Sequence, residues 1–228
     1  MSESDTSSAA AAPSERLLRW VLAVGIVGGP LAFLIGGVFN PSIHESGVLS
    51  LTHNAHASPV TNAIHLVAFV VASYLLPFGA IGLAWLAYPR TPWLASIAGL
   101  LAVIGWLPFS ALTAQDDVTN ALAQLPDSAS YGGFWDHFTN DPVMLSYLVV
   151  YVVGHLTSYV LFGIALGRGR IISWWATWML AASSPLTLTA FVFPYRLVVG
   201  AVALGLVVIG SVPAAVAMIR GRRVPAAT

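Results

Sequence analysis

The stretch AIHLVAFVVASYLLPFGAIGLAWLAY, residues Ala63–Tyr88, decides the fold class of this chain. It contains no Asp, Glu, Lys or Arg, and its only ionisable side chains are one histidine and two tyrosines. The hydrocarbon core of a bilayer is about 30 Å thick, and a helix needs about 20 apolar residues to cross it. The stretch is longer than that, so it predicts a transmembrane helix.

Five further stretches have the same character. They are long, apolar and free of acidic and basic residues: Trp20–Phe39, Trp93–Leu112, Val143–Leu166, Ile171–Phe193 and Leu197–Ile219. Apolar residues make up 57% of the 228 residues and charged residues 8%, whereas about 25% is usual for charged residues in soluble domains. The sequence therefore predicts an all-α polytopic membrane protein, a six-transmembrane-helix bundle whose main partner is the lipid bilayer.

Composition also excludes several classes of function. The chain has no cysteine, so disulfides, thiolate metal sites and cysteine nucleophiles are excluded. It has no basic run and no alternation of basic and aromatic residues, so we expect no nucleic-acid partner. The sequence does not identify a protein partner.

The arginines predict the orientation of the bundle. Eight of the nine basic residues fall in segments that a six-span arrangement places on one side: Arg16, Arg19, Arg90, Arg168, Arg170, Arg220, Arg222 and Arg223. Basic residues in short loops stay on the cytoplasmic side. We therefore expect a multi-pass protein of the bacterial plasma (inner) membrane with both termini in the cytoplasm.

The expected organisation is one membrane domain, residues 16–223, between a disordered cytoplasmic tail, 1–15, and a C-terminal tail, 224–228. The first span is longer than the about 7–15 residues of a signal-peptide apolar region, so we expect a retained helix. Small residues such as Gly25 and Gly29 predict close helix packing inside the monomer.

Two connections on the extracytoplasmic side, 40–62 and 113–142, are long. Such connections are usually functional or disordered. Apolar residues in Val48–Leu51 and Ala121–Leu125 predict short helices on the membrane surface within them.

Polar side chains within the spans mark a candidate ligand site. Tyr147, Tyr151, His155 and Tyr159 recur every four residues, so they form a slowly drifting stripe on one helix face. His65 lies near the outer end of another span. The stripe could line a pocket or proton path that opens outward. Alternatively, its tyrosines pack in the core with hydroxyls bonded to the backbone or to Ser183 and Ser184.

The extracytoplasmic loops hold a candidate metal site. It would use His44, His53, His56, Asp136 and His137. Imidazole and carboxylate suit zinc, and also copper or iron. No H-E-x-x-H motif is present, and histidines in a solvated loop that merely form hydrogen bonds are the alternative interpretation.

Three kinds of function therefore remain open. The first is binding or transport of a small molecule or cation from the extracytoplasmic side through the His/Tyr-lined pocket. The second is a metal-dependent membrane enzyme in which the outer cluster activates water. The third is a non-catalytic scaffold or accessory subunit. A b-type haem held by His65 and His155 is disfavoured, because the two positions differ in depth by about 13 Å.

Overall fold

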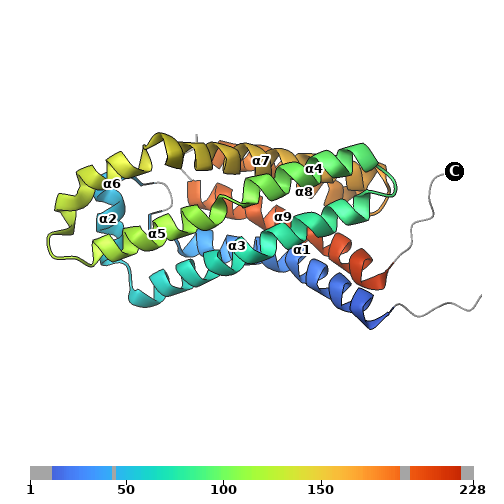
Figure 1. The fold of residues 1–228 in the computed structure, drawn as a ribbon, viewed down its shortest axis with the longest axis horizontal. Coiled ribbons are helices and arrows are strands. Elements are labelled where there is room, and N and C mark those ends of the chain that lie inside the picture. The colour runs from blue at the N-terminus through green and yellow to red at the C-terminus, as the bar shows by residue number, and fades with distance from the viewer. Residues whose placement is uncertain (1–11, 43–44, 191–195, 222–228) are drawn as a thin grey trace, which may run out of the picture.

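A computed structural model of the chain describes residues 12–42, 45–190 and 196–221. In these residues the regular structure is entirely helical (Figure 1). In chain order the elements are α1 Pro13–Phe39, α2 Gly47–His56, α3 Pro59–Ala87, α4 Pro92–Trp106, α5 Phe109–Ala123, the 3-10 helix η1 Ser128–Tyr131, α6 Gly132–Thr139, α7 Pro142–Arg168, α8 Trp174–Ala190 and α9 Arg196–Arg220. The predicted all-helical class is confirmed.

Within the described residues, five helices are long and apolar enough to cross a membrane. They are α1, α3, the broken helix formed by α4 and α5 together, α7 and α9. The remaining predicted span, Ile171–Phe193, corresponds to α8, which packs between α7 and α9. Residues 191–193 lie outside the described part of the chain, so the count of six spans stays a prediction.

The outer surface of the bundle suits lipid. Large apolar side chains are exposed along it, including Val67 of α3, Leu100 of α4 and Val149 of α7. Trp93 and Trp174, at the starts of α4 and α8, are among the most exposed side chains, at 82% and 76%. Tryptophans at helix ends are typical of the membrane–water interface. The exposed apolar area therefore fits a helical membrane protein rather than a soluble bundle.

The helical segment in the structure is longer than the third predicted span, Trp93–Leu112. The helix breaks at Leu107 and Pro108, because proline has no N–H to donate, and then continues as α5 to Ala123. The short helix predicted at Ala121–Leu125 is therefore the end of α5 rather than a separate element. The short helix predicted at Val48–Leu51 is confirmed as part of α2.

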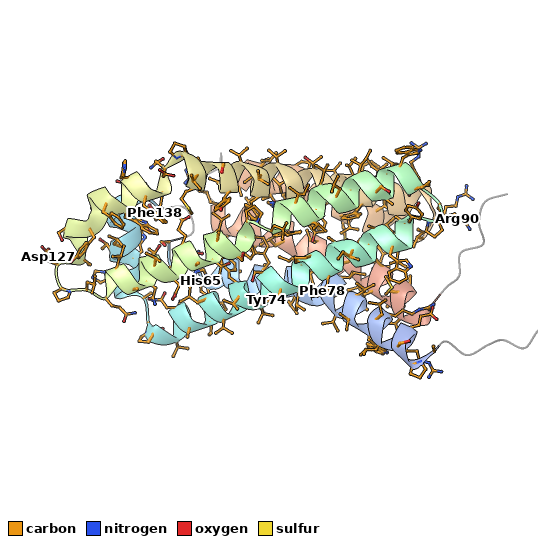
Figure 2. The ribbon with its side chains drawn as sticks, viewed as in Figure 1. His65, Tyr74, Phe78, Arg90, Asp127 and Phe138 are labelled. Atoms are coloured by element: carbon orange, nitrogen blue, oxygen red, sulfur yellow. The ribbon has the colours of Figure 1, made fainter. Side chains whose placement is uncertain are left out.

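The two ends of the bundle differ in charge. One end of the bundle holds the start of α1, the turn between α3 and α4, and the end of α9 (Figure 1). We call this the arginine end, since Arg19, Arg90 and Arg220 belong to these segments. At the opposite end lie α2, η1 and α6. We call it the acidic end, since Asp127 directly precedes η1 and Asp136 belongs to α6. Figure 2 labels Arg90 and Asp127 at these two extremes.

Two glycines allow a close backbone contact between α1 and α3. A Cβ atom added to Gly79 would lie 2.5 Å from the carbonyl oxygen of Gly25, and one on Gly25 would lie 2.6 Å from the Gly79 nitrogen. Small residues permit this approach in lipid, where association depends on packing. The predicted packing role of Gly25 within the monomer is confirmed.

Gly79→Ala is expected to lower the free energy of unfolding by about 1–3 kcal/mol, because the added methyl group meets backbone that has no room to move. Gly205→Ala is the matched control, since a Cβ there meets nothing within 4 Å. Thermal or denaturant unfolding in detergent measures both. Equal midpoints for the two variants would contradict the assigned contact between α1 and α3.

Candidate ligand cavity

A cavity of about 440 Å³ lies within the bundle towards the acidic end. Its walls come from α1, α5, α7, α8 and α9, with Ser50 of α2, Phe69 of α3 and Trp135 of α6 also on its surface. Small-molecule sites in proteins usually have volumes of about 300–1,000 Å³. The cavity is therefore large enough for a small organic ligand.

Small residues of α9 leave this space open. Gly200 and Ala201 both line the cavity, and a Cβ added to Gly200 would meet nothing within 4 Å. On the facing side, Gly37 of α1 also lines it. Larger side chains at these positions would occupy the space that the cavity now provides.

Aromatic rings form one wall of the cavity. Phe33 of α1 contacts Phe109 edge-on, with ring centroids 5.1 Å apart, and Phe109 stacks on Tyr151 of α7 at 5.5 Å. Phe69 of α3 contacts both phenylalanines, at 5.5 Å and 5.2 Å. The faces of such rings are negative and attract cations. The wall can thus hold an apolar body or a positive charge.

His155 lies at the inner end of this wall, and its orientation is fixed by the backbone. Its Nδ1 contacts the carbonyl oxygen of Tyr151, one turn earlier in α7. A carbonyl can only accept, so Nδ1 carries the hydrogen and Nε2 of the neutral ring is left as an acceptor. The Trp106 ring lies 4.8 Å from the imidazole. His155 therefore offers one free acceptor nitrogen.

A second glycine contact places Trp106 beside His155. A Cβ added to Gly154 would lie 2.6 Å from the Cα of Gly105, and one on Gly105 would lie 2.5 Å from the His155 nitrogen. Because α4 and α7 touch through these glycines, the residues that follow them are brought ring to ring. The position of His155, which forms the floor of the cavity at its inner end, depends on this contact.

Asp116 provides a carboxylate in the cavity wall, and buried His65 stands behind it. Asp116 Oδ2 lies 3.5 Å from His65 Nε2, while His65 Nδ1 donates to the carbonyl oxygen of Gly36 at 3.0 Å. The His65 side chain is 3% exposed and that of Asp116 is 31% exposed. Figure 2 shows His65 where α3 runs beside α5. The two side chains lie side by side where α3 and α5 meet at the cavity.

The structure divides the predicted His/Tyr site. Tyr151 and His155 line the cavity, whereas His65 does not line it and contacts two residues that do, Asp116 and Phe69. Tyr159 is buried below it, while Tyr147 is 41% exposed and does not line it. Four residues of helix turn slightly more than one full circle, so the two ends of the stripe drift away from the cavity.

A polar network holds α2 over the acidic end. The Asn54 side chain donates to Ser42 Oγ at 2.7 Å and to the Ser50 carbonyl at 2.9 Å. Asn62 of α3 donates to the Asn54 carbonyl of α2 at 3.3 Å and to Asn120 of α5 at 2.8 Å. Asn54 and Asn62 are buried, and buried amide N–H groups that are bonded in this way favour one arrangement, although Asn62 Oδ1 has no partner among the described residues. The network orients α2 relative to α3 and α5.

The residues of the predicted metal site are not brought together in the described structure. His53 and His56 lie on α2, and Asp136 and His137 lie on α6; all four side chains are exposed. His56 Nδ1 bonds to the Thr52 carbonyl at 2.8 Å. In residues 12–42, 45–190 and 196–221, no group of three or more His, Asp or Glu side chains could hold a metal ion. His44 lies outside these residues, so a site that includes it stays a prediction.

Three comparisons with known proteins find no match. No protein-family model, no curated protein and no solved structure matches this chain. The candidate site is therefore defined by its geometry: an aromatic cavity with a carboxylate in its wall and a histidine at its inner end.

A cysteine at Gly200 is expected to react with a water-soluble maleimide, because that position lines the cavity. A cysteine at Ala203, on the same helix but 0% exposed, is expected to stay unmodified in the folded protein. The chain has no native cysteine, so mass spectrometry of each variant gives the extent of labelling directly. Equal reactivity of the two thiols would show that water does not enter the cavity preferentially.

Proposed function

We propose that the chain crosses the plasma membrane six times, with the arginine end and both termini in the cytoplasm. The support is the gathering of Arg19, Arg90 and Arg220 at one end, since basic residues near spans favour the cytoplasmic side. Ala190 at the end of α8 and Arg196 at the start of α9 both line the cavity. The chain thus runs along α8 towards the acidic end and returns along α9.

This orientation predicts which thiols an impermeant reagent reaches in intact cells. A cysteine that replaces Asp127 is expected to be labelled from outside, whereas one that replaces Arg90 is expected to be labelled only after permeabilisation. Both native side chains are exposed, at opposite ends of the molecule (Figure 2). Labelling of the Arg90 position in intact cells, with protection of the Asp127 position, would reverse the orientation.

We further propose that the cavity binds a small organic cation from the extracytoplasmic side. The observation that carries this proposal is the Asp116 carboxylate in a cavity whose wall includes the rings of Phe33, Phe69 and Phe109. An ammonium group gains both from a nearby carboxylate and from aromatic faces. The apolar body of the ligand would occupy the remaining space beside Gly200.

The charges around the cavity support a cation rather than an anion. Glu45 and Asp116 both line it, and Arg196 is its one basic residue among those described. Two further acidic residues of this end are exposed: Asp117, next to Asp116 in sequence, and Asp136, whose carboxylate lies beside Gly47. A negative potential at the mouth of a low-dielectric cleft raises the local concentration of cations.

The bundle is tightly packed between the cavity and the arginine end. Leu76 of α3, Phe162 of α7 and Leu180 of α8 are at most 1% exposed. Transport would require this core to open, because these three side chains are buried in it. The arrangement is therefore that of a binding site that faces one side of the membrane.

Phenethylamine, an ammonium ion with an aromatic body, is the probe for this proposal. It is expected to raise the thermal midpoint of the purified protein in a saturable manner. Asp116→Asn is expected to weaken its binding about tenfold or more, because the ligand loses a charged partner in a largely apolar cavity. Asp117→Asn, next in sequence and absent from the cavity wall, serves as the control.

Gly200→Trp gives an independent check on the location of the probe. The indole would fill the cavity and abolish probe-induced stabilisation, whereas Gly205→Trp, which also has open space but lies outside the cavity wall, would preserve it. Unchanged probe binding in both Asp116→Asn and Gly200→Trp would refute the proposed site.

A further inference from the structure

A second, much smaller space adjoins the inner end of the cavity. Its volume is about 20 Å³, and its lining includes Trp106, His155, Tyr159 and Ser184. His155 and Thr187 line both spaces, so the small space continues from the floor of the larger one.

Two polar groups in the lining of this space have no partner. Trp106 Nε1 and Ser184 Oγ are buried and form no hydrogen bond with any described residue. The two residues are 2% and 3% exposed. Buried N–H and hydroxyl groups are nearly always hydrogen-bonded in folded proteins. Their position on one small space indicates that something polar belongs there.

His155 adds a complementary acceptor. Its Nδ1 is occupied by the Tyr151 carbonyl, and Nε2 forms no hydrogen bond with a described residue. The residues that line the space thus carry an indole N–H that can only donate, an imidazole nitrogen that accepts, and the hydroxyls of Ser184 and Tyr159, which can do either. One O–H group satisfies this set, since its oxygen accepts from Trp106 and its hydrogen bonds to His155.

The size of the space also fits one oxygen. To hold a water molecule, a cavity needs about 10–15 Å³ of space that the centre of a water-sized sphere can occupy, together with two to four polar partners. The space provides about 20 Å³, and its lining carries four candidate partners, in Trp106, His155, Tyr159 and Ser184.

We propose that Trp106, His155 and Ser184 form a binding subsite for a single hydroxyl oxygen. A water molecule occupies it in the free protein, and a hydroxyl group of the ligand replaces that water in the complex. The ligand part of this inference rests on the proposed function and narrows it: the preferred ligand is an organic cation that carries a hydroxyl group at the end remote from its charge.

The water is tested without any ligand. Ser184→Ala is expected to lower the thermal midpoint by about 2–4 °C, because it removes a partner of the bound water. Ser211→Ala is the matched control: Ser211 is also buried and without a partner, but it lines neither space. Its midpoint is expected to stay unchanged or to rise. A rise for both variants would show that the subsite is empty and would overturn the proposal.

The ligand hydroxyl is tested with two amines that differ by one oxygen. Tyramine is expected to bind about tenfold more tightly than phenethylamine, and Trp106→Phe is expected to abolish that preference, because it keeps an aromatic ring but removes the N–H donor. Equal binding of the two amines to the native protein would overturn the ligand part and leave a subsite for water alone. Binding of neither amine, with the Ser184 and Ser211 variants still differing, would reject the proposed function and retain the water site.

Discussion

The contact between Gly105 in α4 and Gly154 in α7 is the constraint on which the site depends. No side chain separates the two backbones there, so Trp106 and His155, the next residues of each helix, meet with ring centroids 4.8 Å apart. In lipid no hydrophobic drive presses helices together, and small residues are what allow such an approach. The floor of the cavity is therefore set by backbone packing rather than by the polar groups themselves.

The two histidines in the spans, His65 and His155, are oriented by the same kind of hydrogen bond. Each directs Nδ1 to a backbone carbonyl, of Gly36 for His65 and of Tyr151 for His155. This leaves Nε2 as the nitrogen available for chemistry, beside Asp116 in one case and next to the small polar space in the other. Polar groups inside a membrane are expensive and are usually paired or functional. His155 meets that expectation in the wall of the cavity, and His65 meets it behind Asp116.

The helical fold could be predicted from hydropathy, because stretches such as Ala63–Tyr88 have no other stable arrangement in a bilayer. The boundary of α5 could not. Gln115, Asp116 and Asp117 lower the hydropathy after Leu112, so the chain there was expected to leave the helix. In the structure it stays helical to Ala123, and this extension is what brings Asp116 to His65.

The candidate site could be predicted only in part, because its residues come from several helices. A period of four residues identified Tyr151 and His155, but the drift of the stripe places Tyr147 outside the cavity. The aromatic wall draws single rings from α1, α3 and α5, and no spacing within one helix signals such a set. The unpartnered Trp106 and Ser184 likewise become visible only when α4 and α8 are placed beside His155.

A density map of the protein with phenethylamine, set beside a map of the free protein, tests the central claim most directly. The account predicts additional density between Asp116 and His155, against the rings of Phe33 and Phe109, with the glycine contact of α4 and α7 intact. A cavity filled by neighbouring side chains, or ligand density elsewhere on the bundle, would contradict it.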